Sequence, residues 1–123
     1  MRITVCILAS VLAASASVQR TVHETNGPDC SGGWPTNMSF SWLKNAGLLT
    51  NAEVDFSKTK TSRLASQRVG HDLYHQVYLV QFIKRSGESV EAIAVHDASM
   101  EECSMAGVEV FVVSKHLNPG GKN

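Results

Sequence analysis

Three histidines lie in the part of the chain with the strongest strand pattern, and histidine is a common ligand for transition metals. His71 and His75 lie at the start of the first arm of a predicted hairpin, and His96 lies at the end of the second. With a two-residue turn at Ser86–Gly87, the strand register makes His75 the diagonal neighbour of His96, within about 8 Å. Period-two alternation then puts His71, His75 and His96 on one sheet face. This arrangement predicts a candidate site for zinc or copper.

This metal hypothesis depends on the length of the turn. A three-residue turn would turn one strand over and separate the histidines, because side chains alternate between the two faces of a sheet. We prefer the alternative that the histidines are ordinary polar residues at the solvated end of a sheet. The metal site stays open as a second interpretation.

The segment His71–His75 also resembles the His-Glu-x-x-His motif of zinc peptidases, with Asp72 at the position of the glutamate. That motif requires a helix, which places residues four apart on one face. Here the segment leads directly into a predicted strand, and aspartate reaches less far than glutamate. No serine stands in a Gly-x-Ser-x-Gly turn, and no glycine-rich phosphate loop is present. We therefore predict no catalytic residue.

The composition is electrically balanced, with 11 basic and 11 acidic side chains among 123 residues. Without a basic field, the chain is not expected to bind nucleic acid. The length allows one domain. We expect an arm over residues 17–33, a single domain over 34–117 and a loose tail over 118–123.

The N-terminus has the pattern of a secretory signal. Arg2 precedes an apolar run over residues 3–14, and Ala14-Ser15-Ala16 is a small-x-small cleavage pattern. Residues 1–16 are therefore predicted to be removed on export to a periplasm or the extracellular space. The apolar run is too short to span a bilayer, so no membrane span is expected in the mature chain.

Removal of the signal would remove Cys6 and leave Cys30 and Cys103. Two cysteines in an oxidising compartment are expected to pair. Such a bridge closes a loop of about 70 residues and would stabilise the fold by about 4 kcal/mol on the chain-entropy model.

One helix is predicted, with its entry over Trp34–Asn37 and its end near Gly47. Thr36 or Asn37 would cap its start, and Gly47 would end it in a left-handed conformation. The predicted buried stripe has four-residue spacing and consists of Met38, Trp42 and Ala46, broadened by Phe40 and Leu43. Trp42 is thus expected in the core. Trp34 follows two glycines and precedes a proline, so it is expected to point outward and contact a partner. The alternative, which stays open, is that Trp34 only fastens the arm to the end of the helix.

The rest of the domain reads as strands. Leu73–Val95 carries β-branched and aromatic residues on both sides of a polar turn, which is typical of a hairpin. A strand over roughly Thr59–Val69 precedes it, and Val108–Val113 follows it after a polar loop. The predicted fold is α+β, with one helix across an antiparallel meander of about four strands and a single disulfide.

The stretch Gln67-Arg68-Val69-Gly70 lies between two predicted strands after a single helix. It resembles the inhibitory hairpin of cystatins, which are protein inhibitors of papain-like proteases. The cystatin hairpin has one more residue between valine and glycine, its Pro-Trp second loop is not present here, and the cysteines are placed differently. The resemblance implies that this architecture can present hairpin loops to a partner.

These features together favour a small exported binding or inhibitor-type module without enzymatic activity, with another protein as its partner. Trp34 and Gln67–Gly70 are the predicted partner-binding residues. A single helix covers only one face of a four-stranded sheet, so the other face is a second candidate surface. The alternatives are a histidine-based metal-binding protein or metal-dependent enzyme, and a structural component of the cell envelope.

Overall fold

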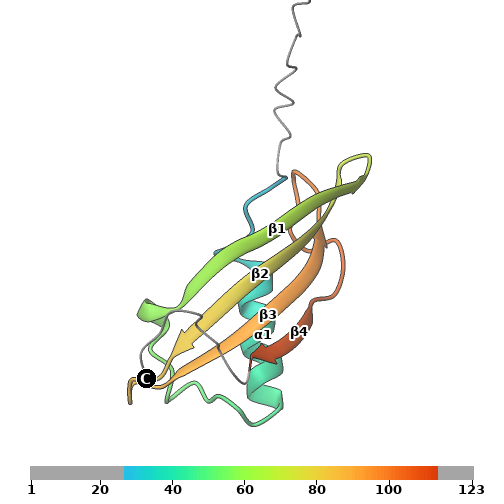
Figure 1. Ribbon diagram of the computed structural model, residues 1–123. Coiled ribbons are helices and arrows are strands. Elements are labelled where there is room, and N and C mark those ends of the chain that lie inside the picture. The colour runs from blue at the N-terminus through green and yellow to red at the C-terminus, as the bar shows by residue number, and fades with distance from the viewer. Residues whose placement is uncertain (1–26, 114–123) are drawn as a thin grey trace, which may run out of the picture.

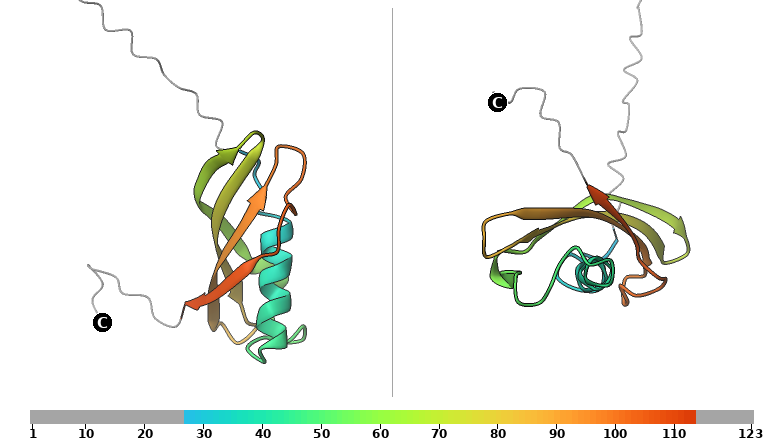
Figure 2. Two further views of the ribbon diagram at one scale, coloured as in Figure 1. Left: turned by 90° about the vertical axis from the view of Figure 1, so that its right-hand side faces the viewer. Right: turned by 90° about the horizontal axis from the view of Figure 1, so that it is seen from below.

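The computed structural model describes residues 27–113. One helix packs across one face of an antiparallel four-stranded sheet, as Figures 1 and 2 show. The elements in chain order are α1 (Trp34–Asn45), the 3-10 helix η1 (Phe56–Lys58), β1 (Lys60–Gly70), β2 (Leu73–Ile83), β3 (Ser89–Ala98) and β4 (Glu109–Val113). The predicted α+β fold is confirmed. The signal peptide predicted over residues 1–16 and the tail predicted over 118–123 lie outside the described residues.

Helix α1 begins at Trp34, after the cap residue Gly33, and so begins earlier than predicted. Pro35 explains the difference, because the first turn of a helix tolerates a residue without a backbone N–H. Thr36 is not a cap: its hydroxyl donates to the carbonyl of Ser31 at 2.7 Å. The predicted end is confirmed, since Gly47 has a left-handed φ of 75°.

The buried face of α1 matches the predicted one only in part, since Leu43 is buried and Met38 and Phe40 pack against the core, but Trp42 does not. Pro35, Ser39 and Leu43 face the sheet at four-residue spacing, whereas Trp42 is 52% exposed. The hydroxyl of Ser39 donates to the carbonyl of Pro35, so this polar group is satisfied inside the helix. The underlying strand β3 contributes fully buried alanines. Small residues on both sides let helix and sheet approach closely, and the larger side chains lie to either side of that contact.

The β2–β3 connection is one residue longer than predicted. Ile83 pairs with Ser89, and the N–H of Lys84 donates to the carbonyl of Glu88 at 2.7 Å. Three residues lie between Lys84 and Glu88, and the last of them, Gly87, has a φ of 92°. This is a three-residue loop that ends in a left-handed glycine. It reverses the predicted relation between the faces of β2 and β3.

The two faces of the sheet therefore carry different side chains. The face under α1 holds the core, and its fully buried members on β2 and β3 are Tyr78, Val80, Phe82, Ala92 and Ala94. The opposite face, here called the open face, carries the half-buried side chains of Val77, Leu79, Ile93 and Val95, and beside them the exposed Phe111. Among the described residues, no helix has the length and apolar character needed to span a bilayer.

Candidate functional site

The predicted histidine cluster does not form. His96 pairs with Gln76 on the face under α1 and is buried. His75 lies on the open face, where its Nδ1 is 2.6 Å from Oδ1 of Asp97. His71 lies in the exposed β1–β2 turn. The prediction that all three share a face was wrong because the hairpin loop has three residues. Within residues 27–113, no group of three His, Cys, Asp or Glu side chains is placed to hold a metal.

His96 serves instead as an anchor for a loop. Its Nδ1 donates to the carbonyl of Cys103 at 2.9 Å, while its Nε2 is buried without a hydrogen-bond partner among the described residues. Burial lowers the pKa of His96 below its ordinary value of 6.5, against hydrogen bonds that act in the opposite direction. At neutral pH the ring is therefore uncharged, with its proton on Nδ1.

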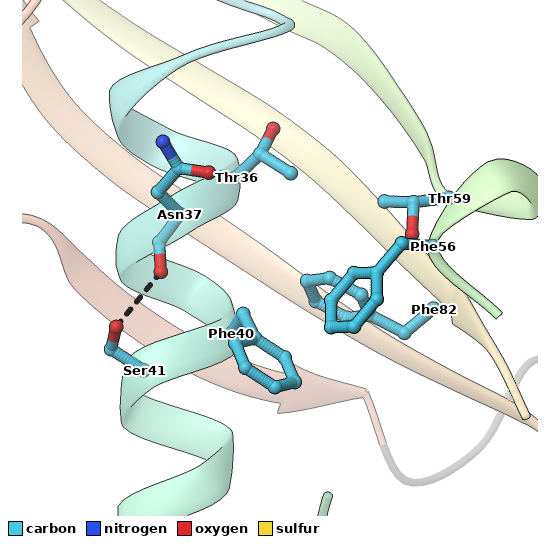
Figure 3. Close-up of a pocket in the computed structure, with 7 residues that line it drawn as sticks. All are labelled: Thr36, Asn37, Phe40, Ser41, Phe56, Thr59 and Phe82. Carbon is cyan, nitrogen blue, oxygen red and sulfur yellow. Dashed lines mark hydrogen bonds between the residues drawn. The ribbon is translucent and has the colours of Figure 1, made fainter. Parts of the chain in front are cut away.

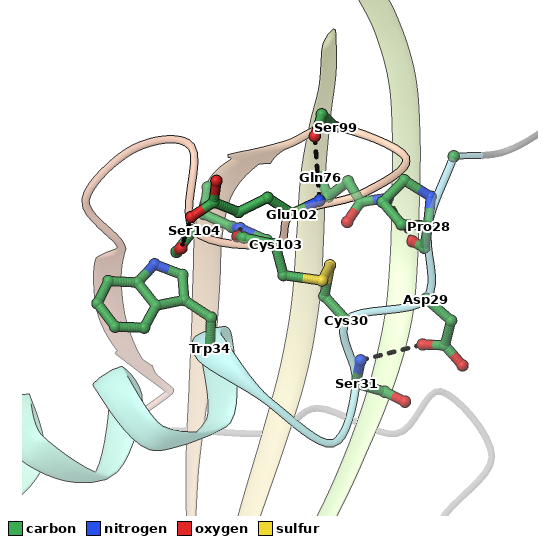
Figure 4. The surroundings of a disulfide bond; sticks show 12 residues. Pro28, Asp29, Cys30, Ser31, Trp34, Gln76, Ser99, Glu102, Cys103 and Ser104 are labelled. Carbon is green, nitrogen blue, oxygen red and sulfur yellow. Dashed lines mark hydrogen bonds between the residues drawn. A yellow bond between two sulfur atoms is a disulfide. The ribbon is translucent and has the colours of Figure 1, made fainter. Parts of the chain in front are cut away.

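The predicted disulfide between Cys30 and Cys103 is confirmed. Figure 4 shows the bridge between the arm that precedes α1 and the β3–β4 loop. A bridge of this kind is compatible with an extracellular or periplasmic location, because structural disulfides persist in oxidising compartments.

A buried hydrogen-bond network holds the arm on the sheet. The hydroxyl of Tyr78 accepts from the N–H of Cys30 at 2.9 Å and donates to Oε1 of Gln76 at 3.0 Å. Gln76 and Arg63 both donate to the carbonyl of Pro28 at 2.9 Å. Burial raises the pKa of Tyr78, so its hydroxyl keeps the proton that it donates. The arm is thus fixed by polar contacts as well as by the disulfide.

Trp34 does not project into solvent as predicted. Its ring is half-buried against the core, and its indole N–H donates to the carbonyl of Ala106 at 3.2 Å. Figure 4 shows the ring next to the disulfide and the β3–β4 loop. Trp34 therefore links the start of α1 to that loop. Its predicted contact with a partner stays a prediction.

The β3–β4 loop is also tied to the β1–β2 hairpin. Asp72 adopts a left-handed φ of 54° at the hairpin tip, a conformation that aspartate tolerates better than most residues. Its Oδ1 accepts from the N–H of Met100 at 2.8 Å. Inside the loop, the N–H of Ser99 donates to the carbonyl of Glu102 at 2.8 Å. The loop therefore has a defined shape although it contains no helix or strand.

Three segments thus meet at one end of the molecule, the upper end in Figure 1 and in the left view of Figure 2. We call this surface the loop end; it consists of the arm (27–33), the β1–β2 tip (67–73) and the β3–β4 loop (99–107). Its exposed apolar side chains are Val69, Met100 and Met105, with 52%, 53% and 48% of their surface accessible.

The structure exposes all four residues of the predicted stretch Gln67–Gly70, at the end of β1. Nε of Arg68 donates to the carbonyl of Gly70 at 3.0 Å, which supports the tip from within. Sequence reasoning missed Met100 and Met105, because residues in an irregular loop follow no period that would show which side chains face outward. The one available signal was two methionines in an otherwise polar loop.

Comparison of the chain with protein-family models, with curated proteins and with solved structures finds no match.

Proposed function

We propose that the protein is a small exported binding module that contacts a protein partner through its loop end. The observation that carries this proposal is the set of three exposed apolar side chains on two adjoining loops. Val69 stands on the β1–β2 tip, and Met100 and Met105 stand on the β3–β4 loop. Apolar side chains gathered on an exposed surface are typical of protein-binding sites, and methionine adapts its shape to a partner.

The fixed shape of these loops supports the same proposal. The disulfide and the ring of His96 both hold the β3–β4 loop at Cys103. The carboxylate of Asp72 holds it at Met100, and the indole of Trp34 holds it at Ala106. A surface ordered before binding loses little conformational entropy when the partner arrives, which strengthens binding. The four restraints converge on the loop end rather than on the β2–β3 hairpin at the opposite end of the sheet.

An inhibitor is the specific form of binding module that the stretch Gln67–Gly70 favours. This stretch resembles the inhibitory hairpin of cystatins, and here it lies on an exposed tip beside a second exposed loop. A projecting edge of this kind suits a partner with a cleft. Papain is therefore the first probe. Inhibition that saturates at one equivalent and disappears in a Val69→Asp variant would support the inhibitor form.

The general proposal is tested by capture from the compartment to which the protein is exported. Immobilised wild-type protein is compared with Val69→Asp and Met100→Asp, and with Phe111→Asp as a matched control, since Phe111 is 56% exposed on the open face. We expect the wild type and the Phe111 variant to retain the same partner and both loop-end variants to lose it. A partner that is lost only with Phe111→Asp would place the binding surface on the open face and contradict the proposal.

A further inference from the structure

The sheet has two edge strands, and the chain protects only one of them against pairing with another sheet. The strand order β1-β2-β3-β4 leaves β1 and β4 each with one side that no other strand of residues 27–113 covers. Such an edge presents backbone N–H and C=O groups to any strand that comes alongside. The two edges therefore have to be compared.

The β1 edge is protected. This strand carries three basic side chains, at Lys60, Arg63 and Arg68, and its register with β2 shifts twice. Charged side chains and bulges both discourage pairing at a sheet edge. The segment that leads into β1 is also packed on the core, because Phe56 of η1 meets Phe40 of α1 edge to face, with ring centroids 5.0 Å apart (Figure 3).

The β4 edge lacks this protection. Its sequence is Glu-Val-Phe-Val-Val, without a basic residue, a proline or a glycine, and its register with β3 runs without a shift. Valine and phenylalanine favour the β conformation. Phe111 is 56% exposed on the open face, and Val112 is 49% exposed on the other face of the sheet. β4 is therefore a regular, apolar edge that is available for pairing.

The hydrogen bonds of the β2–β3 loop determine which backbone groups of β4 point outward. The N–H of Lys84 donates to the carbonyl of Glu88, and hydrogen-bonded pairs then recur at every second residue of an antiparallel ladder. Counted along the unbroken registers, alternate residues of β3 turn their backbone groups toward β4, and Phe111 pairs with one of these residues. The N–H and C=O of Phe111 therefore point toward β3, whereas those of Val110 and Val112 point away from the sheet.

These four outward groups match a second copy of the same strand. In an antiparallel pair centred on Phe111, Val110 of one copy lies opposite Val112 of the other, and the outward groups make four hydrogen bonds. The two Phe111 side chains then face each other at a pair without hydrogen bonds, where the Cα atoms are closest, at about 4.5 Å. Glu109 lies opposite Val113, so no like charges meet across the pair.

We propose that the protein forms a dimer with twofold symmetry through β4, in which the two four-stranded sheets join into one antiparallel sheet. A twofold interface uses the same surface on both copies, which the pairing centred on Phe111 satisfies. The interface has only five strand residues from each copy, so it belongs with small, transient interfaces and should depend on protein concentration. It uses no residue of the loop end and does not rest on the proposed function.

Sedimentation equilibrium of the purified protein from micromolar to millimolar concentration tests the dimer. We expect the mass to rise from that of one chain to that of two. Val112→Pro removes one outward N–H from each copy at a position where an edge strand tolerates proline, and Phe111→Lys brings two like charges together. Either change should raise the dissociation constant of the dimer about tenfold or more. Leu64→Lys, at a side chain that is 55% exposed on β1, is the matched control and should leave it unchanged.

Amide exchange followed by NMR tests the same pairing without any substitution. The N–H groups of Val110 and Val112 should exchange more slowly as the protein concentration rises, whereas the N–H of Phe111, which points toward β3 in monomer and dimer, should change little. This measurement keeps the proposal testable even if a variant fails to fold.

Three results would overturn the proposal. A mass of one chain up to millimolar concentration would leave β4 to a strand of a different protein. A dimer weakened by Leu64→Lys but not by the two β4 variants would place the interface on β1. Slow exchange at Val110 and Val112 that does not depend on concentration would show that the edge is covered within a single chain.

Discussion

Leu43→Ala should destabilise the protein more than Trp42→Ala, although tryptophan is much the larger side chain. Leu43 is 1% exposed in the centre of the contact between helix and sheet, whereas Trp42 is 52% exposed. Truncation of Leu43 removes three buried carbons, worth about 0.8 kcal/mol each by transfer. The cavity left behind raises the expected loss to about 3–4 kcal/mol.

For Trp42→Ala we expect a loss of about 1 kcal/mol. About half of the surface of Trp42 is already exposed to water, so the truncation removes few contacts. Alanine also has a higher helix propensity than tryptophan, which offsets about 0.6 kcal/mol of the loss. Urea unfolding followed by far-UV circular dichroism gives both free energies, and equal m-values would show that the two variants unfold from comparable states. A loss for Trp42→Ala equal to or greater than that for Leu43→Ala would refute the assigned helix face.

Three further predictions concern the disulfide, His96 and the glycine of the arm. Cys30 and Cys103 close a loop with a sequence separation of 73. Replacing both with serine should therefore lower the unfolding free energy by about 4 kcal/mol. Two titratable thiols in the denatured, unreduced protein would contradict the bridge. Burial lowers the pKa of His96 in the folded protein below its unfolded value of 6.5. The stability that the neutral ring contributes is therefore fully present above pH 6.5. It is lost as the pH falls from there through the folded pKa, because protonation then favours the unfolded chain. Urea unfolding from pH 7.5 to 5 should show this decline in the wild type but not in His96→Gln, and a flat wild-type profile would contradict it. Gly27→Ala should destabilise the protein more than Gly47→Ala. Both glycines have a positive φ, but only at Gly27 would a Cβ lie 2.7 Å from a tyrosine ring. Thermal unfolding compares the two variants, and equal losses of stability would show that the arm is not packed as described.

The fold was predictable because its signals are local and repeated. The first strand was predicted over roughly Thr59–Val69 and is found at Lys60–Gly70. Its alternation is weak, and the turn at Gly70 is what marked its end. The disulfide followed from the number of cysteines expected to remain after export. Each of these inferences depends on several residues that agree, so an error at one position does not change the outcome.

The predictions that were wrong, those of the strand faces and of the centre of the helix face, each depended on a single position. The number of residues in the loop that ends at Gly87 decides which side chains of β2 and β3 share a face of the sheet. One residue more than predicted puts His75 and His96 on opposite faces. The helix face was assigned by hydrophobicity, which favoured Trp42 over Ser39. The structure buries Ser39 because a small side chain lets the helix approach the sheet, and its hydroxyl bonds within the helix. Hydrophobicity does not report how closely two elements approach. It therefore placed Leu43, Met38 and Phe40 correctly but centred the stripe on Trp42 instead of Ser39.

The candidate site was only partly predictable for a related reason. The tip residues Gln67–Gly70 could be found because strands on both sides mark a hairpin. Met100 lies beside that tip, where its N–H donates to Asp72, a residue 28 positions away in the sequence. Contacts between irregular loops leave no periodic trace in a sequence, and only the folded geometry brings them together.

The most direct test of the loop end as the binding surface is photo-crosslinking in the cell that produces the protein. The photoreactive residue p-benzoylphenylalanine is placed at position 69 or 100 of the loop end, or at position 111 of the open face, where exposure is similar. We predict that positions 69 and 100 form an adduct with the same partner and that position 111 forms none with it. An adduct at position 111 with none at positions 69 and 100 would contradict the account.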